Sequence, residues 1–509
     1  MNSDTEAAWH FHNGTKHPNG NLLRRFHHYN PAQRPFPYKI YKDTQTIKLA
    51  LDKSPHGFPA LRAISDIIKQ SGNAIPDLNT LARILYFSCG ITKKINFGYI
   101  GDVEFRAAAC TGALYHIEIY VACGEIPGLD AGVYHFDPKE MKLDVLRKGD
   151  YRGVLAEASG NDPFVEVAPL TLVFSDIFTR NSAKYQTREY RHAFWDCGTI
   201  LANTLAISTA HKLPSKVVLG FVDDSVNFLL DLNTEKEVSL ALVPIGFSDK
   251  ISKEALQVSK LNLKTEPLSN YDYDDPEIQK IHQNSLLKSI VEVEDWKKIR
   301  IERKTKKPIS SAILIRTDPD NKSLTNPIES VIIKRGSTRE FARKPISFEE
   351  LSTIVYYSTR EIESDFTEPA LSLVELYLIV NDVDGLKQGS YFFHREKNAL
   401  ELLKEGNFRR TAGYLGLDQD LSADCSAALF FMSDLNLILE KFGNRGYRAA
   451  QLEASITGGR CYLASYAQGL GVSGLTFYDD AVTEFFSPHA KDKSVMFMVV
   501  LGKKQKNPY

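Results

Sequence analysis

The sequence repeats itself at a spacing of 257 residues, as from Gly132 to Gly389, and this repeat limits the folds open to the chain. Residues 132–136 (GVYHF) match residues 389–393 (GSYFF), and residues 184–191 (KYQTREYR) match residues 441–448 (KFGNRGYR). The register holds without a gap from about residue 113 to about residue 213, which chance would not produce. The 509-residue chain is therefore predicted to carry two copies of one domain.

Each copy shows the same order of predicted elements. In the first copy and then the second, we expect a short helix (78–88; 348–358), a strand (118–122; 375–380), a hairpin (132–136 with 143–146; 389–393 with 400–403), a strand (170–175; 427–432), a long helix from about Tyr190 or Tyr447, a strand (218–221; 473–477) and a last strand (238–245; 495–501). Because helices and strands do not alternate in regular βαβ units, the pattern predicts an α+β sandwich rather than a doubly wound sheet.

We place the two domains at residues 63–250 and 305–509. Residues 1–62 then form an N-terminal arm rich in His, Asn and Pro, and residues 251–304 form a charged linker. The histidines of the arm have no carboxylate or thiol at ligand spacing, so no metal site is predicted. Asp223 and Asp479 recur after a predicted strand in both copies, where capping of a helix is a better interpretation than metal binding.

Composition excludes several classes of function. The 62 Lys and Arg residues balance the 63 Asp and Glu residues, so a dedicated nucleic-acid binder is not expected. No run of about 18 apolar residues exists to span a membrane. The N-terminus lacks the apolar core of a signal peptide. The six cysteines are scattered without a CxxC pair, which is typical of reduced thiols in a cytoplasmic protein.

One segment offers several donors for an anionic ligand. Arg335, Gly336, Ser337 and Arg339 follow the apolar stretch 330–333 at the start of the second copy. Arginine supplies forked donors, serine a small one, and glycine lets a ligand approach the backbone, so a phosphate would suit this turn. A solvated, charged helix start is the alternative interpretation.

Five segments together resemble a known family. They are the strap 335–339 and residues 9–17 (WHFHNGTKH), 110–120 (CTGALYHIEIY), 184–191 and 441–448. This set resembles the nitroreductase family, more narrowly its SagB-type branch of flavin dehydrogenases, which oxidise thiazoline and oxazoline rings of peptides. The chain departs from that branch where Cys-Thr-Gly replaces Ser-Gly-Gly and where His116 replaces a proline.

The resemblance implies two nitroreductase-like α/β/α sandwich domains that form an intramolecular pseudo-dimer, with FMN at their interface. Arg335 and Ser337 would contact the flavin ring or ribityl chain, and Arg339 its phosphate. Lys503 and Lys504 would add a basic contact, or else belong to a solvated tail. The facing wall would come from the other copy, at Ala109, Cys110, Thr111 and Gly112.

The two copies differ in a complementary way. The strap position of the first copy (residues 67–73, IIKQSGN) has neither arginine, while the wall of the second copy (residues 367–371) carries Glu368, which would repel a phosphate or an electron-rich ring edge. Only one composite site is complete. We therefore predict one FMN per chain.

Lys184 and Tyr185 occupy the Lys-Tyr position that azoline dehydrogenases use for acid/base work, so the resemblance implies that they are catalytic. The second copy has Lys441 and Phe442 there. If the segment is helical, Arg188 and Arg191 could lower the pKa of Tyr185. Their recurrence in both copies also suits structural ion pairs.

The leading hypothesis for function is an FMN-dependent dehydrogenase or oxidase acting on an azoline of a peptide or carrier-bound substrate in natural-product biosynthesis. An NAD(P)H-dependent nitro- or quinone reductase, using a small-molecule substrate, is the second hypothesis. A flavin-binding scaffold of a peptide-modification complex is the third. Partners could include a cyclodehydratase or a carrier protein, and further oligomerisation is open.

Overall fold

The two halves of the chain contain matching sets of helices and strands. The computed structural model describes residues 2–18, 34–98, 101–249, 254–269, 274–301, 312–315, 317, 325–368 and 371–505. The first half contains α1 (Glu6–Gly14), β1 (Thr46–Lys48), α2 (Ala60–Ser65), α3 (Leu78–Cys89), β2 (Ile91–Asn96), β3 (Asp102–Arg106), β4 (Ile117–Cys123), β5 (Gly132–Asp137), β6 (Lys142–Lys148), α4 (Arg152–Ala158), α5 (Pro163–Val167), β7 (Leu170–Ile177), α6 (Phe178–Tyr185), α7 (Glu189–Ala210), α8 (Asp223–Leu229) and β8 (Glu237–Ile245). The second half contains α9 (Pro276–Asn284), α10 (Ile290–Lys297), β9 (Ile313–Leu314), α11 (Ile328–Lys334), β10 (Ile346–Ser347), α12 (Phe348–Ser358), β11 (Glu375–Val380), β12 (Val383–Asp384), β13 (Gly389–His394), β14 (Ala399–Glu405), α13 (Arg409–Leu415), α14 (Asp420–Asp424), β15 (Ala427–Ser433), α15 (Leu435–Phe442), α16 (Asn444–Ala467), β16 (Gly471–Gly474), α17 (Asp479–Phe486) and β17 (Ser494–Gly502).

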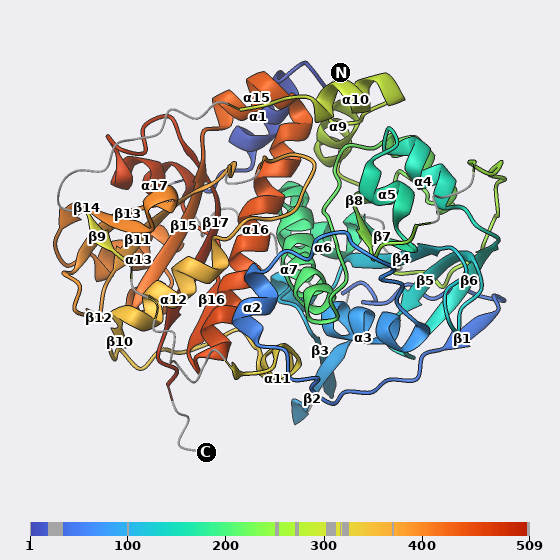
Figure 1. Cartoon of the computed structure of the whole chain (residues 1–509). Helices are drawn as coiled ribbons and strands as arrows, with labels where there is room; N and C mark the ends of the chain where they lie inside the picture. The colour runs from blue at the N-terminus through green and yellow to red at the C-terminus, as the bar shows by residue number, and fades with distance from the viewer. Residues whose placement is uncertain are drawn as a thin grey trace.

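Two antiparallel sheets stand on either side of the long helices α7 and α16 (Figure 1). The strand order β6-β5-β4-β7-β8 in the first sheet recurs as β14-β13-β11-β15-β17 in the second. The predicted duplication and the α+β class are thereby confirmed. Two predicted elements, β11 and α12, agree to the residue; α12 begins at a capping box between Ser347 and Glu350.

One predicted strand does not form. Residues 218–221 make only an isolated bridge, between Val218 and Leu242, and β16 covers only the start of the matching segment in the second half. The backbone N–H groups of Leu219 and Gly220 donate instead to the carboxylate of Asp365, at 2.8 and 2.7 Å. A side chain of the other half thus binds the backbone of this segment.

A pseudo-twofold axis passes between α7 and α16. These helices pack against each other, and nearly every residue of both is buried. A Cβ atom on Gly198 would lie 1.8 Å from Ser455 Oγ, and one on Gly459 would lie 2.6 Å from Ala202 Cβ. In both pairs the two residues are 257 apart, so equivalent positions meet each other, as at the centre of an isologous dimer interface.

Reciprocal ion pairs extend this symmetry. Asp223 of the first half binds Arg445 at 2.7 Å and Arg448 at 3.0 Å, both of the second half. In return, Asp479 binds the equivalent arginines of the first half, Arg188 at 3.2 Å and Arg191 at 2.6 Å.

These ion pairs test two predictions made from the sequence, on the role of the aspartates and on the role of the arginines. The prediction that Asp223 and Asp479 cap helices is wrong, because each starts the first turn and reaches the other half. Burial alone would raise the pKa of Asp479, but Arg188 and Arg191 hold that pKa well below its usual range. Arg188 and Arg191 are thus structural ion-pair partners.

Two helices that lie outside the predicted repeat are also related by the pseudo-twofold axis. In α1, His12 O and Thr15 Oγ1 just beyond it accept hydrogen bonds from Arg191, at 2.7 and 3.0 Å. At α9, His282 O and Ser285 Oγ accept the same bonds from Arg448, at 3.0 and 2.8 Å. The helix α9, which lies within the predicted linker, therefore holds the place that α1 holds in the first half.

Two further observations concern the whole molecule. All six cysteines are free thiols, and five of them are buried. Among the described helices, none combines the length and the apolar character that crossing a membrane would need.

Candidate functional site

The strap of the second half lies against the first half. After α11, residues 335–342 run between β16 and the C-terminal tail, with Thr338 N bound to Val472 O at 2.9 Å and Ala342 N bound to Lys503 O at 2.9 Å. The buried guanidinium of Arg335 donates to Arg106 O at 2.7 Å and to Ala107 O at 2.9 Å. The fold therefore brings the predicted strap and the predicted wall together.

Three cations gather at this junction, which we call the cation cluster: Lys93, Arg335 and Lys504. Lys93, on β2 of the first half, donates to Arg335 O at 3.2 Å. Lys504 Nζ lies 3.8 Å from the ring centroid of Tyr466. Burial, and then repulsion from Arg335 and Lys504, lowers the pKa of Lys93. Like charges held this close favour an anionic ligand.

Lys93 was not predicted from the sequence. It belongs to a Lys-Lys pair on a short strand, with no motif around it. Only the pairing of β2 with β3 and the contact of both halves place it beside Arg335. The sequence carries no signal that would have found it.

The other residues predicted to bind FMN from the second half occupy different surroundings. Ser337 Oγ lies 3.4 Å from the hydroxyl of Tyr462, within the site. Lys504 belongs to the cation cluster, whereas the Lys503 ammonium forms an ion pair with Glu350 at 2.5 Å. Arg339 is exposed.

The wall of the first half is held from behind by one carboxylate, that of Asp196 on α7. It accepts hydrogen bonds from Cys110 Sγ at 3.0 Å, Thr111 Oγ1 at 2.8 Å and the Thr111 N–H at 2.8 Å. Burial and the charge of Asp196 raise the pKa of Cys110 well above its usual range. Cys110 is therefore a protonated thiol and not an activated nucleophile.

Lys184 and Tyr185 stand at the end of α6, next to this wall. A Cβ atom on Gly112 would lie 2.8 Å from the Tyr185 hydroxyl, so only glycine fits there. Lys184 Nζ lies 5.1 Å from the ring centroid of Tyr185. Burial, and then the charge of Arg34, lowers the pKa of Lys184. Tyr185 thus lies against Gly112 of the wall, and Lys184 lies beside the Tyr185 ring.

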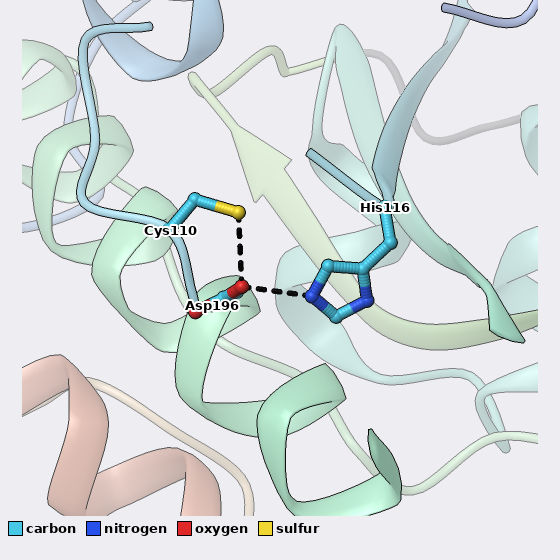
Figure 2. Close-up of side chains that lie close together, drawn as sticks. All are labelled: Cys110, His116 and Asp196. Carbon is cyan, nitrogen blue, oxygen red and sulfur yellow. Dashed lines mark hydrogen bonds and ion pairs between the residues drawn. The ribbon is translucent and has the colours of Figure 1, made fainter. Parts of the chain in front are cut away.

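His116 lies on the far side of Asp196 from Cys110 (Figure 2), and two further carboxylates lie near it. His116 Nε2 is 2.8 Å from Asp196 Oδ2, and its Nδ1 is 2.6 Å from Asp176 Oδ1 and 3.4 Å from Glu189 Oε1. Burial alone would lower the pKa of His116, but Asp176 and its neighbours raise that pKa well above 6.5. Burial and Asp176 raise the pKa of Glu189. The only sequence signal was His116 in place of a proline.

The equivalent position in the other half lacks the cations. Ala60 N donates to Asn326 O and Ile328 N donates to Phe58 O, so α2 and α11 are equivalent at a spacing of 268 residues. Arg335 and Arg339 then correspond to Ile67 and Ser71. The alignment of the two straps predicted from sequence is wrong by three residues. In either alignment the first copy has no arginine at the strap positions.

The wall at that second position is different as well. Glu368 forms an ion pair with Arg300, beside a cavity of about 360 Å³. Pro369 and Ala370 of this segment lie outside the described residues.

Comparisons of sequence place these features among known proteins. No family model matches the chain. The chain is similar to a nitroreductase-like protein of Methanocaldococcus jannaschii, at 26% identity over 169 residues, which are 33% of this chain and 80% of that protein. It is also similar to the trifolitoxin-processing protein TfxB of Rhizobium leguminosarum bv. trifolii, at 31% identity over 161 residues, which are 31% of this chain and 43% of that protein. The microcin B17-processing protein McbC of Escherichia coli is 26% identical over 151 residues, 29% of this chain and 55% of that protein. The chain thus spans about half the length of these two peptide-processing relatives.

A solved structure matches the whole molecule. A nitroreductase-like protein of Anabaena variabilis superposes with a TM-score of 0.77 at 24% identity, over 98% of this chain and 99% of that one. The chain therefore has the fold of nitroreductase-like oxidoreductases, present twice in tandem. The resemblance to this family seen in the sequence is confirmed.

Proposed function

We propose that the chain is an FMN-dependent dehydrogenase or oxidase that converts a thiazoline or oxazoline of a peptide or carrier-bound substrate to the aromatic ring. The cation cluster carries this proposal, because it needs both halves and lies beside the wall that Tyr185 contacts. The similarity to two peptide-processing proteins supports a peptide substrate.

The residues at the junction fit FMN. Its phosphate needs several positive charges, and the cation cluster together with Arg339 would supply them, with Arg335 also reaching the flavin ring or ribityl chain. A Cβ atom on Gly336 would lie 3.7 Å from Lys93 Nζ, so the turn brings a bare stretch of backbone beside the cluster. Ser337 would bind the ribityl chain or the ring, and residues 109–112 would form the facing wall.

The chemistry divides between the cofactor and the chain. When bound, FMN supplies the acceptor for the hydride that leaves one ring carbon of the azoline. Lys184 or Tyr185 would remove the proton from the ring carbon beside the acyl group, so that loss of a hydride and a proton yields the aromatic ring. The lowered pKa of Lys184 favours this role, because it increases the neutral amine at pH 7.

We expect the purified chain to bind one FMN. The equivalent position has Ile67, Ser71, Phe247 and Ser248 in place of Arg335, Arg339, Lys503 and Lys504, so it offers no comparable charge for a phosphate. The ratio of flavin to protein, from absorbance after denaturation and an independent protein assay, measures the count. Two FMN per chain would overturn the assignment of a single site.

Replacing Lys93 with alanine should weaken FMN binding by about 10- to 100-fold, because a hydrogen bond or ion pair to a charged group contributes about 1.5–3 kcal/mol. Titration of the apoprotein with FMN, followed by flavin fluorescence, measures the dissociation constant. Lys94→Ala is the matched control, since this neighbour is exposed and pairs with Asp102 and Glu104. An equal loss in both variants would contradict a role for Lys93 at the phosphate.

The substrate is tested with a synthetic thiazoline peptide under air, in parallel with NADPH plus a nitroaromatic compound. Formation of thiazole with release of hydrogen peroxide supports the proposal. Turnover of NADPH without thiazole formation would support a reductase instead. Activity that appears only after a cyclodehydratase is added would make the chain one subunit of a peptide-modification complex.

A further inference from the structure

Behind the wall, three carboxylates surround a single imidazole in the protein interior. His116, Asp176 and Glu189 are completely buried, and Asp196 is nearly so. A protonated His116 would balance only one of the three negative charges. Within the described part of the chain, Asp176 Oδ2 and Glu189 Oε2 accept no hydrogen bond. Buried carboxylate oxygens without a partner are costly, so the cluster must take up either protons or a metal ion.

The fold itself does not require this cluster. At the equivalent positions of the second half, Leu373, Ser433 and Gly446 replace His116, Asp176 and Glu189. That half retains only a carboxylate at the position of Asp196, and this Glu453 accepts hydrogen bonds from Ser372 Oγ and Leu373 N. Holding the wall segment thus takes one carboxylate. The other three residues serve a different purpose.

We propose that His116, Asp176 and Glu189 bind a divalent first-row transition-metal ion. The ligand atoms lie within 4.8 Å of one another, and one imidazole nitrogen with carboxylate oxygens is a donor set that suits Zn²⁺, Mn²⁺ or Fe²⁺. His116 Nδ1 would coordinate the ion together with Asp176 and Glu189. The free oxygens of both carboxylates allow bidentate coordination to complete the shell.

Asp196 supplies the supporting contact that such a site needs. A histidine that binds a metal through one nitrogen commonly donates its other N–H to a carboxylate, which fixes the ring and its tautomer. His116 Nε2 lies 2.8 Å from Asp196 Oδ2 in this arrangement. Asp196 also holds Cys110 and Thr111, so the ion would stiffen the wall through His116. The proposal does not depend on the identity of the cofactor or the substrate.

Elemental analysis of the full chain, purified without a histidine tag, tests the site. We expect about one metal ion per chain, and after chelator treatment we expect one equivalent of Zn²⁺, Mn²⁺ or Fe²⁺ to bind and raise the melting temperature. His116→Gln and Glu189→Gln should each lose at least nine-tenths of the bound metal, since each removes a ligand. Glu118→Gln is the control: this carboxylate is equally buried, but it pairs with His135 and Arg180.

Three results would overturn the proposal: no metal in the purified chain and no binding of any of the three ions, full metal content in His116→Gln, or equal loss in Glu118→Gln. In the first case the carboxylates would be neutralised by shared protons. If the ligand variants do not fold, anomalous scattering from crystals of the unmodified chain decides the question. A peak at His116 Nδ1 supports the site, and a metal located elsewhere refutes it.

Discussion

Lys184→Ala and Tyr185→Phe should each retain FMN and lose about 10²- to 10⁴-fold in turnover of a thiazoline peptide, which is the usual contribution of a positioned acid or base. Neither residue belongs to the cation cluster, so binding of the flavin should be unchanged. Tyr185 stands beside Gly112 at the wall, and Lys184 stands beside Tyr185. Single-turnover reduction of the bound flavin by substrate measures the step directly.

The second half provides the control for this experiment. Lys441→Ala removes the equivalent lysine, which pairs with Glu440 at 3.2 Å and corresponds to the position without the strap arginines, so turnover should stay at the unmodified level. If Lys184 is the base, the rate should rise with pH as its ammonium loses a proton, below the usual pKa of 10.5, and Lys184→Ala should remove that dependence. Unchanged rates in both variants would remove Lys184 and Tyr185 from the mechanism.

Asp479→Asn should destabilise the chain by about 3–5 kcal/mol, because it leaves the buried Arg188 and Arg191 without their counter-charge. Asp223→Asn should cost a similar amount on the other side of the pseudo-twofold axis. Chemical denaturation followed by tryptophan fluorescence measures both. Asp480→Asn is the matched control, because this exposed neighbour pairs only at the surface with Lys16 and should cost less than about 1 kcal/mol.

The pH dependence gives a second test of the same ion pairs. The pKa of Asp479 is depressed in the folded chain, so its stabilisation is complete above the unfolded value of 3.8. That contribution is lost as the pH falls below 3.8 and through the folded value. The difference in stability between the unmodified chain and Asp479→Asn should therefore shrink in acid. A difference that is constant from pH 7 to about pH 2 would contradict this account.

Much of the fold could be predicted because local sequence specifies it. Apolar runs marked β4, β7, β11 and β15, and apolar residues at three- and four-residue spacing marked α12. The predicted strand at residues 218–221 does not form, and its backbone is bound by Asp365 of the other half, a contact that local sequence does not reveal. The linker was predicted from its charged residues alone. The equivalence of α9 and α1 is shown by their hydrogen bonds with Arg448 and Arg191, which the sequence does not reveal.

The candidate site shows the same division. The strap, the wall and the Lys184-Tyr185 pair are continuous in sequence and carry recognisable motifs, so they could be named beforehand. Lys93 and the His116 cluster could not, because their partners are distant in the chain. A single lysine or histidine has no periodicity to reveal it.

The sequence by itself determined that this protein contains two copies of one domain, and that only one copy retains the arginines of the strap. Both facts are carried by residue identity and spacing alone. The tertiary structure decided how the two copies are oriented. Helix α7 packs on α16, and Asp223 and Asp479 each form ion pairs with the other half. The tertiary structure also decided that a lysine of the first half completes the charge of the second, since charges interact through space and not along the chain.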